Sequence, residues 1–204
     1  KVNMPSYKLT YFDAKGIAEV SRQIFVHAGQ PYEDVRVTKE EWQTLKPKTP
    51  FGTLPVLEVD GKPIPQSAAI ARFLAKKFDL AGKTDLDAAT VDAFVDQFKD
   101  YLVDFNKYGY VALGFREGDK DALLAEHGGP ARDKFFTIVT KQLVKNKNGF
   151  LVGGGLTFAD LFIAQHVEVL QDRLPGFLDA YPEVRNHQKK IHSLPKIKEW
   201  IEKR

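Results

Sequence analysis

The sequence predicts a mixed α/β unit followed by an all-helical unit. In roughly the first eighty residues, strand and helix patterns alternate in the order β-α-β-α-β-β-α, which suits a small mixed sheet covered by helices. Beyond Asp79 the strand signals largely stop and long amphipathic helices follow, so residues 80–83 form the predicted linker. We therefore expect one domain over 1–82 and a second, all-helical domain over 83–204.

The elements of the first unit follow from apolar spacing and from turn signals. Apolar residues recur at helical spacing over 16–28, and Thr38 with Glu41 matches a capping box that opens a short helix. Asp60-Gly61 is a strong hairpin signal. The predicted strands cover 7–12, 33–37, 56–59 and 62–64, and a further helix begins at Gln66-Ser67.

The segment around this hairpin is the most informative part of the chain. Pro55 enters a strand without donating a ladder hydrogen bond, which suits an edge or a bent entry with a cis bond. The main chain of Leu54 is then available to pair with an extended peptide. The helix start at Gln66 and Ser67 offers N–H groups to a carboxylate. The segment predicts a site for a small peptide with an acidic end, and the alternative is a plain hairpin followed by a surface helix.

The second unit is predicted to begin with a long helix capped by Thr84 and Asp87. The apolar stripe expected to face the core consists of Val91, Phe94, Val95, Phe98, Leu102 and Phe105. Another side carries an acidic row made of Asp92, Asp96, Asp100 and Asp104. Such a row is usually a solvated face, and it gains a role where a partner or ligand supplies positive charge. Further helices are predicted over 131–146, from a capping box at Thr157–Asp160, and after Pro182 and Pro195.

Composition excludes several classes of function. The chain has no cysteine, so its own side chains support no disulfide and no thiol chemistry, which rules out a redox thioredoxin or glutaredoxin. The net charge of +3 is mild and the five histidines form no i, i+4 pair, so we expect neither nucleic acid nor a metal as ligand. No apolar run could span a bilayer and Lys1–Pro5 shows no secretory pattern, so we expect a cytoplasmic protein with no membrane partner.

Several segments taken together resemble one enzyme family. They include YKLTYF at 7–12, PFG at 50–52, LPVLEVDG at 54–61, GFLVG at 149–153, LTFAD at 156–160 and IKEWI at 197–201. In order and spacing, nearly the whole chain resembles the cytosolic glutathione transferases. Within that family it resembles the sigma class, especially the invertebrate, nematode-like members.

The resemblance implies a fold, an assembly and a co-substrate. Members of this family are dimers whose subunits have a thioredoxin-like N-terminal domain followed by an all-helical domain. That organisation agrees with the change of character near residue 80. It also implies glutathione as co-substrate, no metal, and small hydrophobic electrophiles as the second substrate.

The resemblance further implies roles for individual residues. Tyr11 looks like the catalytic tyrosine whose hydroxyl donates to the sulfur of glutathione, although by itself it is an ordinary strand aromatic. Trp42 and Lys46 match side chains that hold the glycine carboxylate, although alone they are a helix anchor and a surface charge. Asp100 matches an aspartate that reaches across the dimer toward the γ-glutamyl group. The residues that resemble glutathione ligands are Tyr11, Trp42, Lys46, Gly52, Thr53, Leu54, Pro55, Gln66, Ser67 and Asp100. The candidates for the electrophile pocket are Phe12, Ile17, Tyr108 and Leu113.

Three positions depart from the family pattern. Position 17 is isoleucine where some sigma members have an arginine near the catalytic tyrosine, which implies weaker thiolate stabilisation and a more apolar pocket. Lys15 stands where arginine is common, and Thr53 replaces a usual lysine or glutamine.

The expected activity is addition of glutathione to electrophiles such as aryl halides or lipid-derived enals, as in detoxification. Two alternatives remain open from the sequence. One is a glutathione-dependent prostaglandin isomerase of the same class. The other is a crystallin or ligand carrier that kept the fold without turnover, against which the retention of Tyr11, Trp42 and Lys46 argues.

Overall fold

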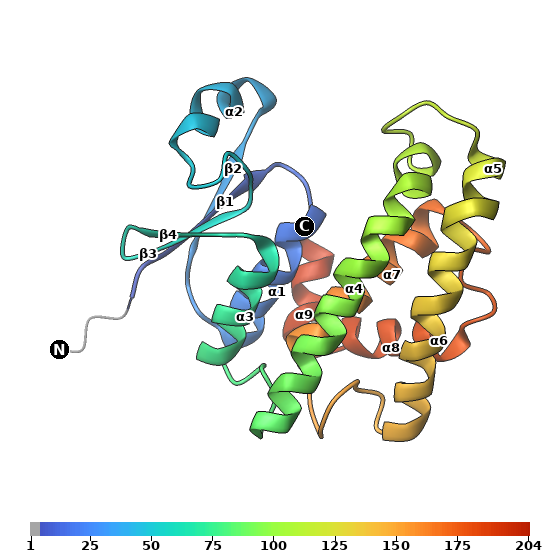
Figure 1. Ribbon diagram of the computed structural model, residues 1–204. Helices are drawn as coiled ribbons and strands as arrows, with labels where there is room; N and C mark the ends of the chain where they lie inside the picture. Colours follow the sequence, from blue (N-terminus) through green and yellow to red (C-terminus); the bar gives the residue numbers. More distant parts are fainter. Residues whose placement is uncertain (1–4) are drawn as a thin grey trace. The chain divides into compact units, whose positions relative to one another are not determined.

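The computed structural model describes residues 5–204, so the expectation about a secretory pattern at the start of the chain falls largely on residues outside it. The chain forms two compact units (Figure 1). The first unit contains the chain up to Ala81 together with Pro195–Arg204, and the second contains Gly82–Leu194. The division lies one residue from the expected boundary, but the expected helical domain included residues 195–204, which pack with the first unit instead.

The first unit is built on a mixed sheet, as the alternation of patterns predicts. Its strands are β1 (Tyr7–Phe12), β2 (Glu33–Val37), β3 (Val56–Val59) and β4 (Lys62–Pro65), in the order β2-β1-β3-β4. β2 runs parallel to β1, whereas β3 is antiparallel to both β1 and β4. The hairpin turn between β3 and β4 uses positive φ angles at Asp60 and Gly61, the conformation that an Asp-Gly pair favours.

Helices cover both sides of this sheet (Figure 1). A 3-10 turn η1 (Gly16–Ala18) leads into α1 (Glu19–Ala28), which lies beside α3 (Ser67–Lys77) on one face. On the other side lies α2 (Lys39–Leu45), followed by the 3-10 turn η2 (Lys46–Lys48). The last helix, α9 (Pro195–Lys203), packs along α1. The side chains at the centre of this unit are fully buried and apolar: Leu9, Ile24, Phe25, Leu57, Ile70 and Leu74.

The second unit is helical throughout. Its main helices are α4 (Asp85–Ala112), α6 (Gly129–Asn146), α7 (Phe158–Arg173) and α8 (Pro182–His192). The capping boxes predicted at the starts of α4 and α7 are both formed. Between α4 and α6 the chain makes α5 (Lys120–Leu123) and a π-helical turn η3 (Leu124–Gly128). These two short elements were not predicted, because their sequence carries no regular apolar spacing.

The buried stripe of α4 differs in part from the prediction. Phe94 and Leu102 are partly exposed, whereas Tyr101 is buried. The Tyr101 ring stacks on Phe135 with a centroid separation of 4.8 Å, and its hydroxyl lies 2.9 Å from Nε2 of His166. A tyrosine whose hydroxyl has a buried partner is as acceptable in the core as a leucine. Tyr101 is therefore buried although the predicted stripe contained Leu102 and not Tyr101.

A buried carboxylate fixes the start of α7. The side chain of Asp160 is fully buried and accepts hydrogen bonds from the N–H groups of Thr157 and Leu151, each at 2.8 Å. Nε2 of His187, on α8, lies 2.8 Å from the same carboxylate. The capping box therefore also ties α8 and the preceding loop to α7.

His166 makes the stability of the second unit depend on pH. Its ring lies within about 5.4 Å of the rings of Phe98, Tyr101 and Phe105, and burial lowers the pKa of His166 from 6.5 to about 3. Below pH 6.5 the unfolded chain binds a proton that the folded chain does not take up until about pH 3. The free energy of unfolding should therefore fall by about 1.4 kcal/mol for each pH unit below about 6.5 through this group.

Urea unfolding at pH 7.5 and pH 5 measures this effect. His166→Gln keeps an amide near the Tyr101 hydroxyl and cannot titrate, so its stability should change less between the two pH values than that of the unmodified chain. An equal change in both proteins would contradict the assignment.

Candidate functional site

The register of the sheet brings three of the predicted site residues to one end of it. In the ladder, Val56 pairs with Thr10 on one side and with Pro65 on the other. The next residues outward in the three strands are Tyr11, Pro55 and Gln66. These residues therefore follow one another across β1, β3 and β4.

Gly16 and Arg22 lie close to the side chain of Tyr11 at this end of β1. A Cβ atom placed on Gly16 would stand 2.6 Å from the Tyr11 hydroxyl, and φ at Gly16 is +45°. Both facts require glycine at this position. The guanidinium carbon of Arg22 lies 5.9 Å from the centroid of the Tyr11 ring. The partly exposed tyrosine therefore lies next to a glycine backbone and a buried cation.

Helix α2 leads to two further predicted ligands, one helical turn apart. The ring of Trp42 packs edge-on against Phe12 with centroids 5.8 Å apart, and both residues border a depression of about 500 Å³. Lys46 begins η2, and its Cε would lie 3.9 Å from a Cβ placed on Gly52. The ring contact of Trp42 thus links α2 to the end of β1, and the side chain of Lys46 lies near Gly52 in the loop that enters β3.

The entry to β3 has the geometry that the sequence indicated. Gly52 has φ +63°, Thr53 is exposed, and the Leu54–Pro55 bond is cis. The ladder of β3 begins at Val56, so the main chain of Leu54 lies outside it. This arrangement leaves Leu54 at the margin of the sheet, where strand addition takes place in other proteins.

The N-terminus of α3 lies at the same end of the sheet. Gln66 is the N-cap with φ 76°, its side chain makes no capping hydrogen bond, and Ser67 is the first helical residue. The first N–H groups of a helix carry partial positive charge, and without a side-chain cap they suit an anionic group.

The remaining predicted residues are placed as follows. Ile17 belongs to the first unit and is 46% exposed. In the second unit, Asp100 is an exposed residue of α4 and borders a depression of about 210 Å³. Tyr108 is only 3% exposed, and its ring stacks on Phe177 at 5.8 Å. Leu113 is the partly exposed C-cap of α4. Tyr108 is thus a core residue of the helical unit, and its role in an electrophile pocket stays a prediction.

Sequence reasoning did not select Gly16 or Arg22. The available signals were a glycine between a strand and a helix, and an arginine one turn after Ala18 on the buried side of α1. Neither signal distinguishes a site residue without knowledge of which chain segments meet.

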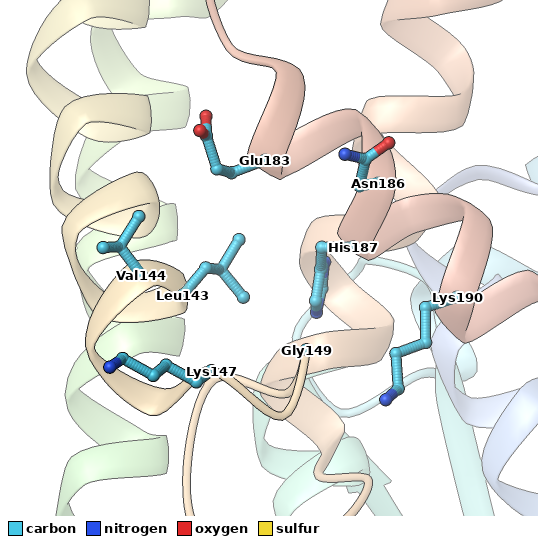
Figure 2. Close-up of a pocket in the computed structure, with 8 residues that line it drawn as sticks. All are labelled: Leu143, Val144, Lys147, Gly149, Glu183, Asn186, His187 and Lys190. Atoms are coloured by element: carbon cyan, nitrogen blue, oxygen red, sulfur yellow. The ribbon is translucent and has the colours of Figure 1, made fainter.

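A separate depression of about 260 Å³ lies between α6 and α8 (Figure 2). The side chain of His187 lines it and is paired with Asp160, and Nζ of Lys190, also a lining residue, donates to the carbonyl of Asn148. These groups brace the loop before α7, and we assign no chemistry to this depression.

Within residues 5–204, no three His, Asp or Glu side chains gather closely enough to hold a metal ion. Over the same range, none of the helices combines the length and apolar character needed to cross a membrane.

Comparisons with known proteins give matches along the chain. The family model described as "Glutathione S-transferase, N-terminal domain" matches residues 7–76, and "Glutathione S-transferase, C-terminal domain" matches residues 104–204. "Probable glutathione S-transferase 9" of Caenorhabditis elegans is 47% identical over 201 residues. "Glutathione S-transferase 1" of Ascaris suum is 45% identical over 201 residues. Each of these alignments covers 98% of this chain and 98% of the relative.

Solved structures resemble the whole chain as well. A Nu-class GST from Haemonchus contortus is 54% identical with a TM-score of 0.90, and 98% of this chain and 97% of that one are covered. Monomeric Na-GST-3, a glutathione S-transferase of the hookworm Necator americanus, is 50% identical with a TM-score of 0.93 and the same coverage. Prostaglandin synthase D of Nilaparvata lugens is 36% identical with a TM-score of 0.85, with 98% of each chain covered.

Proposed function

Because the chain belongs to the glutathione S-transferase family, we propose that it adds the thiolate of glutathione to small electrophiles, with Tyr11 as the catalytic hydroxyl. The family uses glutathione as co-substrate. The observation that carries the proposal is the strand register, which aligns Tyr11, Pro55 and Gln66 at the end of the sheet where α3 begins.

The chemical task of Tyr11 is to favour the thiolate over the thiol. A free thiol with a pKa of about 8.5 is only about 3% ionised at pH 7. Lowering this pKa by about two units, or roughly 2.7 kcal/mol, ionises most of the bound glutathione. A preorganised hydroxyl in a partly dry site can supply much of this stabilisation. The close approach of Gly16 to the Tyr11 hydroxyl supports this role, because it restricts where the hydroxyl can stand.

The proposed anchors match the three parts of the tripeptide. Lys46 offers a positive charge and Trp42 an indole N–H to the glycine carboxylate. The main chain of Leu54, outside the β3 ladder, pairs with the cysteinyl unit. The γ-glutamyl carboxylate meets the start of α3 at Gln66 and Ser67. Gly52, Thr53 and Pro55 shape the loop that presents Leu54.

The second substrate is proposed to be a small apolar electrophile, such as an aryl halide or a lipid-derived enal. The exposed Ile17 supports an apolar wall beside Tyr11 in place of an arginine. Phe12, Tyr108 and Leu113 remain the other proposed pocket residues. Detoxification and a cytoplasmic location remain the expectations drawn from the sequence.

A second candidate activity is glutathione-dependent prostaglandin isomerisation. The observation that favours it is the full-length similarity to prostaglandin synthase D of Nilaparvata lugens, at 36% identity. Assaying isomerisation of a prostaglandin endoperoxide beside conjugation of chlorodinitrobenzene separates the two activities. A fold without turnover, as in a crystallin, would give neither.

The class within the family is proposed to be Nu. The sequence resembles the sigma class, but a solved structure titled as Nu-class is 54% identical to this chain over 98% of its length. This full-length identity supports the Nu assignment.

We expect the chain to bind glutathione and to need no metal. The anchors at Trp42, Lys46 and the start of α3 motivate this expectation. Titration calorimetry with millimolar glutathione should give saturable binding, and turnover should survive treatment with a chelator. No heat of binding, or activity lost on chelation and restored by a metal, would overturn it.

Replacing Tyr11 by phenylalanine should lower turnover by about tenfold to a thousandfold with little change in glutathione affinity. The ring packing is kept and only the donor is lost, so the apparent pKa of the rate profile should rise toward that of the free thiol. The matched control is Tyr7→Phe, since Tyr7 is a buried residue at the other end of β1. An unchanged pH profile in Tyr11→Phe would show that another donor stabilises the thiolate.

The proposed assembly is a homodimer in which Asp100 of one subunit approaches the γ-glutamyl amino group bound to the other. Asp100→Ala should then weaken glutathione binding without unfolding the chain. The control is Asp104→Ala, because Asp104 is exposed and pairs only with Lys107 among the described ion pairs. Light scattering decides the assembly, and a fully active monomer, the state named for Na-GST-3, would refute the shared site.

A further inference from the structure

Arg22 is a buried cation that the proposed chemistry does not use. Its side chain is 0% exposed, in the middle of α1. Burying a guanidinium is costly unless its charge is paired and its N–H groups find acceptors. Its partners therefore indicate what the arginine holds together.

The first partners of Arg22 are main-chain carbonyls of the turn that follows β1. Nη1 donates to the carbonyl oxygen of Ala14 at 2.9 Å and lies 3.3 Å from that of Lys15. This turn runs directly into Gly16, which lies so close to the Tyr11 hydroxyl that a Cβ atom there would stand 2.6 Å from it. One buried side chain thus holds the segment on which the tyrosine rests.

The same guanidinium is tied to β2. Nε of Arg22 donates to Oδ1 of Asp34 at 3.0 Å, and the other oxygen of Asp34 accepts from Nε of Arg36 at 3.0 Å. Arg36 closes the circuit, because its Nη1 donates to Oδ1 of Asp13 at 2.9 Å. The hydrogen bond to Asp13 raises the pKa of Arg36. The turn is therefore held on its buried side by Arg22 and on its exposed side by Arg36.

A buried carboxylate connects Arg22 to the end of the chain. Glu19 is 1% exposed, and its Oε2 lies 3.3 Å from Nη1 of Arg22. Its other oxygen accepts from Nε1 of Trp200 at 2.7 Å and from Nη1 of Arg204. Through Glu19, helix α9 is tied to the arginine that holds the turn.

We propose that Arg22 is a positioning residue for Tyr11, and that Glu19 extends this control to Trp200 on α9. The proposal rests on the proposed catalytic role of Tyr11. Arg22 fixes the turn at Ala14 and Lys15, the turn places the Gly16 backbone, and that backbone sets where the Tyr11 hydroxyl stands.

Geometry explains why this support matters. The strength of a hydrogen bond to sulfur depends on distance and angle, and a displacement of about 1 Å can lower a rate by about a hundredfold. Gly16 and the Tyr11 hydroxyl are closely packed, since even a Cβ atom on Gly16 would be 2.6 Å from the hydroxyl. A displacement of the turn at residues 14–16 would therefore move the Tyr11 hydroxyl or leave it without its neighbour Gly16.

The arrangement also requires an arginine and not a lysine. Nε of the guanidinium donates to Asp34 while Nη1 reaches the two carbonyls and Glu19, and the single nitrogen of an ammonium cannot stand at both places. Arg22→Lys keeps the charge near Tyr11 but cannot keep all of these contacts. This substitution therefore separates positioning from charge.

The test compares Arg22→Lys with the unmodified chain. We expect turnover at neutral pH to fall about tenfold, glutathione affinity to change less than about twofold, and the apparent pKa of the rate profile to rise by about one unit. Amide hydrogen exchange at residues 14–16 should become faster, since the turn loses its tie. The control is Arg185→Lys, which weakens a surface pair with Asp179 and should change none of these.

Trp200→Phe is the second variant, and it decides the matter if Arg22→Lys does not fold. It keeps an aromatic ring on α9 and removes only the donor to Glu19. We therefore expect turnover, the apparent pKa and hydrogen exchange at residues 14–16 to change in the same directions, by at least about a quarter of the change in Arg22→Lys. Unchanged exchange at residues 14–16 together with an unchanged pH profile in the folded variants would overturn the proposal.

Tyr11→Phe, measured beside these variants, separates the positioning role of Arg22 from the catalytic role of Tyr11. If it shifts the pH profile while the Arg22 and Trp200 variants do not, the proposed function stands and the positioning role is refuted. If it shifts nothing while Arg22→Lys still speeds exchange at the turn, Tyr11 is not the catalytic donor and both proposals are overturned.

Discussion

The pairing of Leu9 with Leu57 across β1 and β3 is the constraint from which the site follows. Both side chains are fully buried, so the two strands cannot slip by one residue without turning these leucines toward solvent. The fixed register sets Tyr11 beside Pro55. Through the β3–β4 hairpin it also sets where α3 begins. The apolar core of a small sheet thus determines the geometry of the candidate site at its end.

Each unit also contains buried charged groups that hold separate segments together. In the helical unit, the carboxylate of Asp160 holds a loop, its own helix cap and His187 of α8. In the first unit, Arg22 and Glu19 do the same for the turn after β1, β2 and α9. A buried charge tolerates few arrangements of its partners, because every unmet hydrogen bond is costly. These buried charged groups therefore fix the positions of the segments they bind, where apolar packing alone would allow several arrangements.

The sequence predicted the features that depend on neighbouring residues. The strands at 7–12, 33–37 and 56–59, the capping boxes and the Asp-Gly turn all appear as expected, because their causes lie within a few residues. The same sequence did not indicate that Tyr101 is buried in place of Leu102, or that residues 195–204 join the first unit. Those outcomes depend on a partner far along the chain, His166 in one case and α1 in the other. The proposed role of Arg22 belongs to the same category, since its contacts with Ala14 and Asp34 exist only once β1, β2 and α1 have assembled.

The membership of α9 in the first unit has a consequence for biosynthesis. A ribosome releases residues 195–204 only after the entire helical unit, so the sheet and its first helices emerge without their last component. During that interval Glu19 lacks the donor on Trp200 that it has in the finished molecule. The first unit therefore reaches its final hydrogen bonding only after the helical unit has been synthesised and residues 195–204 have packed along α1.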